Sequence, residues 1–119
     1  MKSGLQSLTD ILILPEASNN SEPSWFGFII TIIDGEKYPR NKITHFLENH
    51  NIQTRLLFAG NLTKQPAFED VEYRLGSKLT NTDKIMHDTF LIGVYPGLND
   101  EMIDYMIENI KNAVEFAKI

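Results

Sequence analysis

Residues 25–33, with the sequence WFGFIITII, decide the fold of this chain. Apolar side chains occupy both sets of alternating positions along the run, which is typical of a strand that is buried on its two faces. The run holds nine residues and is interrupted by Gly27 and Thr31, so it is too short to cross a bilayer as a helix. The sequence therefore predicts a buried central strand here.

Strands and helices follow one another on both sides of this run. Apolar stretches predict further strands at residues 11–14, 52–58 and 89–95, and helical spacing predicts a helix at 40–49. A second, short helix is predicted to end at residue 87, with Asn81 and Asp83 as its capping residues. A long helix over 99–118 is predicted next, with Asn99 as its cap and one apolar stripe along its length. This order predicts an α+β domain whose small, mainly antiparallel sheet is covered by helices on one face.

Composition limits the classes of function. The chain has 119 residues, enough for one domain, and its net charge of −5 argues against a broad surface for nucleic acid or anionic membrane. There is no cysteine, which excludes a disulfide, a thiolate zinc site and an iron–sulfur cluster within the chain. The first residues, MKSGLQSL, lack the apolar core of a signal peptide, so we expect a cytoplasmic protein.

Catalytic motifs are missing from the sequence. No nucleophile elbow, phosphate-binding loop or dinucleotide fingerprint is present. His45 and His50 are five residues apart, so they do not share a helix face as metal ligands do, and we expect no metal site. We therefore expect no catalytic residue and no complete enzyme in this chain.

The best candidate for a ligand contact is the segment TRLLFAGNLTKQPAF, residues 54–68. A β-type run leads into small residues and then into the polar side chains of Asn61, Lys64 and Gln65, which is how a rigid strand can present a binding loop. Arg55 could bind a phosphate or carboxylate through its forked guanidinium, or form a surface ion pair. An ordinary polar loop is the alternative interpretation.

Three segments resemble one family. SWFGFIITI, IQTRLLFAGNLTKQPAF and LTNTDKIMHDTFLIGVYPGLNDEMIDYMIENI are similar to the C-terminal small domain of DegT/StrS-type sugar-nucleotide aminotransferases, and most similar to its 3-dehydratases. Those lyases remove the C3 hydroxyl of CDP-4-keto-6-deoxy-D-glucose in lipopolysaccharide O-antigen biosynthesis. The resemblance implies a pyridoxal or pyridoxamine phosphate cofactor in a large domain outside this chain, with an iron–sulfur cluster there in some members. It also implies a nucleotide-sugar substrate, a homodimer and a reductase partner.

The resemblance also implies a domain division and a set of binding residues. Residues 1–14 are expected to be the remnant of an inter-domain helix with a first short strand, and 15–119 the small domain, inactive alone. Related aminotransferases carry histidine where this chain has Phe26, so that residue is either a dehydratase feature near the active site or plain core. A small domain of an aminotransferase and a free-standing binding module remain the alternatives. The residues expected to contact the substrate are Phe26, Arg55, Phe58, Asn61, Lys64 and Gln65.

Overall fold

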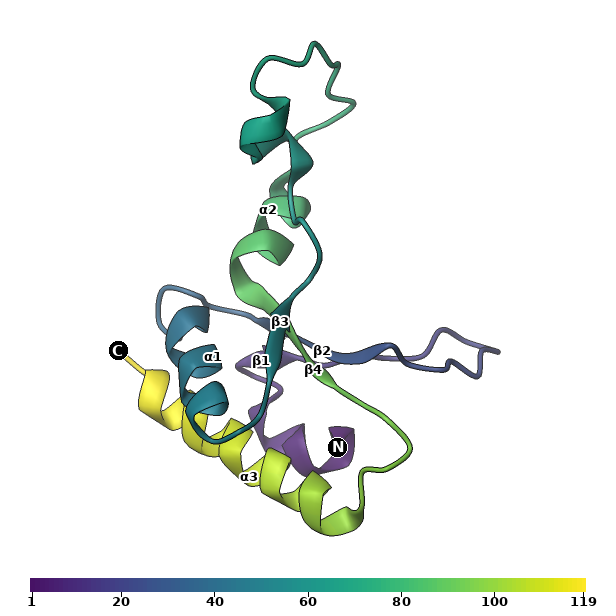
Figure 1. The fold of residues 1–119 in the computed structure, drawn as a ribbon, viewed down its shortest axis with the longest axis vertical. Helices are drawn as coiled ribbons and strands as arrows, with labels where there is room; N and C mark the ends of the chain where they lie inside the picture. Colours follow the sequence, from purple (N-terminus) through teal and green to yellow (C-terminus); the bar gives the residue numbers. More distant parts are fainter.

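A four-stranded antiparallel sheet lies at the centre of the computed structural model, which describes residues 1–119 (Figure 1). The strand order is β1-β2-β4-β3, so β2 and β4 are central, and they align Gly27 with Gly93 and Thr31 with Thr89. The strands are β1 (Leu12–Ile13), β2 (Gly27–Ile32), β3 (Thr54–Leu56) and β4 (Thr89–Gly93).

One face of the sheet builds the hydrophobic core. Side chains alternate across a strand, and Ile30, Ile32, Phe90 and Ile92 point to the same face, where each is 0% exposed. Helices α1 (Arg40–Asn49) and α3 (Asp100–Ala117) and the 3₁₀ helix η1 (Lys2–Leu8) add their apolar residues to this cluster. The expected α+β arrangement, with helices over one face of the sheet, is confirmed.

Helix α3 begins where the sequence predicts. The side chain of Asn99 accepts a hydrogen bond from the backbone N–H of Met102 at 2.8 Å, which satisfies one free donor of the first turn. Its buried stripe includes Ile110 and Val114, both 0% exposed. The predicted helix at 40–49 is also confirmed, with α1 ending at the same residue.

A long arm projects away from this core. After β3 the chain runs through the short 3₁₀ turns η2 (Leu62–Lys64) and η3 (Pro66–Phe68) and returns through α2 (Thr80–Asp88), forming the extension at the top of Figure 1. The radius of gyration is 15.9 Å, whereas a compact domain of this length has about 13.5 Å. Residues 57–79, called the arm below, therefore build a surface rather than a core.

Two sequence-based expectations need correction. Phe26 and Ile33 lie outside β2 and are 81% and 42% exposed, so the run 25–33 is not buried throughout. The strand ends where its neighbours stop pairing, because β4 aligns only with Gly27–Thr31. Asn81 and Asp83 do not cap α2, whose N-cap is Leu79 without a side-chain hydrogen bond.

Candidate functional site

A concavity of about 1110 Å³ opens beside the edge strand β3 and the start of α3. Its lining is mostly apolar and includes the aromatic rings of Phe26, Phe58, Tyr95 and Tyr105. Arg55 is the one cationic side chain among the lining residues. Large concave surfaces with aromatic walls and a few polar groups are where proteins bind small molecules.

Two exposed aromatic rings form one wall of this concavity. The ring centroids of Phe26 and Phe58 are 6.4 Å apart in a stacked arrangement, and the residues are 81% and 78% exposed. Phe58 adopts a φ of 51°, a left-handed conformation that is costly for a bulky side chain. Strained, solvent-facing aromatic residues of this kind are typical of ligand-binding loops. Phe26 therefore lies outside the hydrophobic core of this chain.

Arg55 is free to bind an anion. It lies opposite Leu91 in the pairing of β3 with β4, and its side chain is exposed. The three ion pairs of the chain involve Lys2, Lys64 and Lys84, so Arg55 engages no carboxylate. The alternative interpretation, a surface ion pair, is therefore wrong for this conformation.

Asn61 is buried, at 2% exposure, and its side chain supports the loop itself. Its oxygen accepts hydrogen bonds from the backbone N–H and the hydroxyl of Thr63, at 3.1 and 2.8 Å. Its amide donates to Oδ1 of Asp83 at 2.7 Å. Gln65 likewise donates to the carbonyl of Ala59 at 2.7 Å. These groups hold the loop in shape, and their contact with a ligand stays a prediction.

Lys64 lies at the surface with its ammonium 3.0 Å from Oδ2 of Asp83. The hydrogen bond from Asn61, followed by that from Lys64, holds the pKa of the Asp83 carboxyl below its ordinary value. Asp83 is thus charged and bridges two residues of the loop. Sequence reasoning missed this role, because a carboxylate in the first turn of a helix looks like a capping residue.

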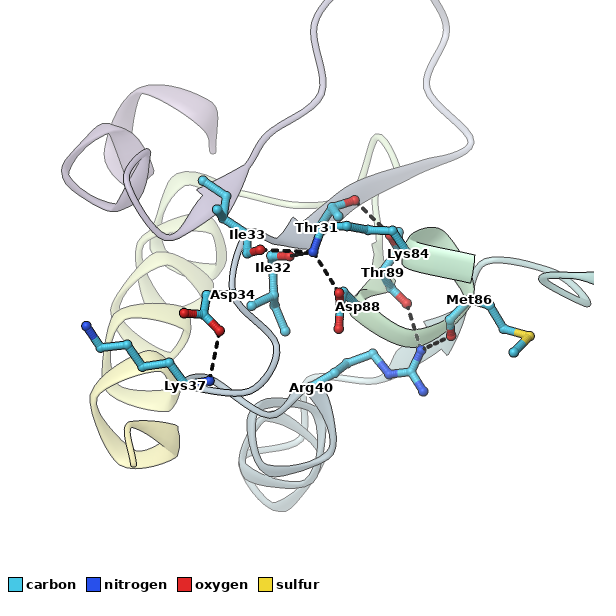
Figure 2. Close-up of polar contacts among 10 residues, drawn as sticks. All are labelled: Thr31, Ile32, Ile33, Asp34, Lys37, Arg40, Lys84, Met86, Asp88 and Thr89. Carbon is cyan, nitrogen blue, oxygen red and sulfur yellow. Dashed lines mark hydrogen bonds and ion pairs between the residues drawn. The ribbon is translucent and has the colours of Figure 1, made fainter. Parts of the chain in front are cut away.

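A second polar cluster fixes α2 to the sheet (Figure 2). The ammonium of Lys84 donates to the carbonyls of Ile32 and Ile33, both at 2.9 Å, and pairs with Asp88 at 2.7 Å. The guanidinium of Arg40 donates to the carbonyls of Met86 at 2.6 Å and Thr89 at 3.3 Å.

Burial lowers the pKa of Arg40, and the nearby charge of Asp88 opposes that shift. The last carbonyl groups of a helix have no backbone partner within it. Arg40 supplies a donor to one of these groups in α2, the carbonyl of Met86. No motif in the sequence marks Arg40 for this task, since its partners are backbone atoms.

The residues of this chain do not fit a lysine-bound cofactor. No lysine lines the concavity. Lys84, which donates to carbonyls at the end of β2, already makes three hydrogen bonds through its ammonium. No group of three or more His, Asp or Glu side chains is placed to hold a metal ion, and no helix is long and apolar enough to cross a membrane.

The chain belongs to the DegT/DnrJ/EryC1/StrS aminotransferase family, whose profile matches residues 1–111. It is 51% identical over 111 residues to the lipopolysaccharide biosynthesis protein RfbH of Salmonella typhimurium. It is 50% identical over 114 residues to dTDP-4-dehydro-2,6-dideoxy-D-glucose 3-dehydratase of Saccharopolyspora spinosa. These alignments cover 93% and 96% of this chain but only 25% and 24% of the relatives. The chain thus spans about a quarter of their length.

Solved structures show the same fold at lower identity. E. coli GDP-4-keto-6-deoxy-D-mannose-3-dehydratase, with bound hydrated PLP, superposes with a TM-score of 0.76 at 21% identity. DesV of S. venezuelae, in complex with a ketimine intermediate, gives a TM-score of 0.77 at 19% identity. The two superpositions cover 92% and 95% of this chain, and 28% and 29% of those proteins.

Proposed function

We propose that this chain is the C-terminal small domain of a sugar-nucleotide 3-dehydratase that depends on pyridoxal or pyridoxamine phosphate. The observation that carries the proposal is its 50% identity to a sugar-nucleotide 3-dehydratase over nearly its whole length. The concavity beside β3 supports it, because a free guanidinium and two exposed rings lie together there.

The proposed contacts follow from the chemistry of each group. Arg55 suits the diphosphate, because its planar fork can donate two parallel hydrogen bonds to phosphate oxygens. The exposed rings of Phe26 and Phe58 offer flat apolar surface to the base or the sugar. Asn61, Lys64 and Gln65 complete the loop, and Lys64 is the one whose charged group stays at the surface.

We assign the cofactor to the part of the enzyme outside this chain. The family resemblance implies a large domain that holds it, and no lysine of this chain lines the concavity. When bound, that cofactor supplies the electron sink for breaking the C3–O bond. The chain alone is therefore proposed to be inactive and to bind no cofactor tightly, and micromolar binding of pyridoxamine phosphate by calorimetry would contradict this.

Several features of the whole enzyme remain predictions of the resemblance. They are a homodimer, a reductase partner and, in the large domain, an iron–sulfur cluster. A cytoplasmic location remains a prediction as well. The relatives also differ in nucleotide, since their names specify dTDP in one case and GDP in another. The CDP sugar expected from the sequence is therefore one of three nucleotide classes to compare.

A chimera tests the proposed function directly. The matching 114 residues of the S. spinosa 3-dehydratase are replaced with this chain, and turnover of dTDP-4-dehydro-2,6-dideoxy-D-glucose is measured. A reductase and its electron donor are added, because replacing the C3 hydroxyl by hydrogen consumes two electrons. We expect the chimera to give a product that has lost its C3 oxygen. A folded, cofactor-loaded chimera without turnover would contradict the proposal. Tight binding of an unrelated ligand by the isolated chain would favour the free-standing module.

Arg55→Ala in this chimera should raise the substrate KM about tenfold or more, which corresponds to about 1.5–3 kcal/mol for a charged hydrogen bond. The melting temperature should hardly change, because Arg55 is exposed and pairs with no carboxylate. Arg74→Ala is the matched control, since Arg74 is also exposed but lies in the arm outside the concavity. A lower melting temperature with unchanged kinetics would make Arg55 a structural residue.

A further inference from the structure

The loop at residues 58–65 is fastened to helix α2. The backbone N–H of Asn61 points at Sδ of Met86, 3.4 Å away, and its side-chain amide donates to Oδ1 of Asp83. The other oxygen of Asp83 holds Lys64. Asn61 is 2% exposed, whereas the side chain of Asp83 is 32% exposed, so their hydrogen bond is partly buried.

The position of Asp83 is set from the opposite side. Lys84, the next residue, donates to the last carbonyls of β2 and its continuation, Ile32 and Ile33. Arg40 holds the C-terminal half of α2 as well, through the carbonyl of Met86, as Figure 2 shows. Helix α2 is thus anchored on the sheet independently of the loop, and it presents Asp83 toward that loop as a fixed acceptor.

Phe58 is the residue that needs such support. Its φ of 51° is unfavourable for a bulky side chain and persists only where surrounding contacts impose it. The backbone N–H of Phe58 donates to the carbonyl of Leu56 at 2.9 Å. The nearest side-chain contacts are those of Gln65 to the carbonyl of Ala59 and of Asn61, three residues later, to Asp83. Loss of the Asn61 contact would release the loop and, with it, the stacked pair of Phe26 and Phe58.

We propose that Asp83 is a positioning residue for the ligand-facing loop. Through Asn61 it holds the loop in the conformation that places Phe58 next to Phe26, and through Lys64 it ties a second residue of the loop to α2. The statement about ligand affinity rests on the proposed function, whereas the statement about loop order does not. Asp83 itself lies outside the lining of the concavity.

Two variants separate the contacts of Asp83. Asp83→Ala removes both oxygens, whereas Asp83→Asn keeps a carbonyl acceptor for Asn61 and removes the charge opposite Lys64. Glu69→Ala is the control, because Glu69 is an exposed acid of the arm with no ion-pair partner. In the 119-residue chain, amide hydrogen exchange of Thr63, whose N–H donates to Asn61 at 3.1 Å, reports loop order.

We expect the amide hydrogen of Thr63 to exchange at least about tenfold faster in Asp83→Ala than in the wild-type chain. In Asp83→Asn and Glu69→Ala, it should exchange at close to the wild-type rate. Unchanged exchange in Asp83→Ala would overturn the proposal. In the chimeric dehydratase, Asp83→Ala should raise KM about tenfold with little change in kcat. The KM of the Asp83→Asn chimera should lie close to that of the wild-type chimera. A KM that does not move in an active chimera would also overturn it.

Failure of the proposed function gives a different result. If the chimera with the wild-type chain is folded but inactive while Asp83→Ala still accelerates exchange at Thr63, the assignment of the substrate fails and the role of Asp83 in the loop stands. If the wild-type chimera is active and Asp83→Ala lowers kcat and the melting temperature together without rescue by Asp83→Asn, the residue is structural and the positioning role is wrong.

Discussion

The core under the sheet and the loop beside β3 are held together in different ways. Phe90 and Ile92 of β4 are 0% exposed and pack among residues of α1, α3 and η1, so burial of apolar surface stabilises this region. In the loop, Phe58 is 78% exposed and the polar side chains make individual hydrogen bonds to α2. Many small contacts hold the first region, and a few directional ones hold the second.

This difference separates stability from recognition. Removing one side chain from a close-packed core leaves a cavity, so substitutions there change the free energy of unfolding of the whole domain. Loss of one contact in the loop releases only a short segment, because little apolar surface depends on it. The arm, which includes this loop, also leaves large apolar side chains exposed, among them those of Leu62, Val71 and Leu75.

The largest effect is expected in the core. Phe90→Ala should lower the free energy of unfolding by about 3–5 kcal/mol, because Phe90 is fully buried in a central strand. Phe58→Ala, the matched control, removes the same side chain from an exposed site and should leave the unfolding midpoint nearly unchanged. Denaturant unfolding followed by circular dichroism measures both. An equal loss in the free energy of unfolding for the two variants would show that the core and the loop contribute to stability in the same way.

Lys84 links the two regions, so its substitution should have an intermediate effect. Lys84→Met keeps the length of the side chain but leaves two carbonyls and Asp88 without their donor, which should cost about 1–3 kcal/mol. Lys42→Met is the control, since Lys42 is exposed on α1 and forms no ion pair. If thermal unfolding shows the same midpoint for both variants, α2 is not anchored by this cation.

Gly60→Ala should have a smaller, local effect. Gly60 has a φ of 64°, and an added Cβ would overlap Cγ of Met86 on α2. We expect a cost of about 1 kcal/mol, with faster amide exchange confined to the loop. Gly76→Ala is the control, because no atom lies within 4 Å of its added Cβ and its φ is not positive. A neutral Gly60→Ala would show that the loop is free to move away from α2.

The smallest effect concerns acid pH. Asn61 and Lys64 lower the pKa of Asp83 in the folded chain, and His87 acts in the same direction. The carboxylate therefore stabilises the loop above its ordinary pKa of about 4, and this contribution is lost as the pH falls through the lower, folded value. The side-chain amide signal of Asn61 should shift in that window in NMR spectra. That of Asn109, which donates to the carbonyl of Tyr105, should stay constant.

Local patterns in the sequence determined the positions of the main elements. The helix at 40–49 and the cap of α3 by Asn99 were predicted correctly, because helical periodicity and capping depend on residues a few positions apart. The strands predicted at 25–33, 52–58 and 89–95 exist, but each predicted range is longer than the strand in the structure. Strand ends depend on the partner strand, and the sequence of one strand does not contain that information.

Only the tertiary structure decided how the candidate site is assembled. Phe26 stacks on Phe58 across 32 positions of sequence, Asn61 reaches Asp83 across 22, and Lys84 reaches Ile32 across 52. Polarity and the family resemblance together marked Asn61, Lys64 and Gln65 as ligand contacts, but Asn61 and Lys64 also hold the loop on α2. Which of these roles a polar side chain takes depends on the distance to its partner, and the folded sheet sets that distance.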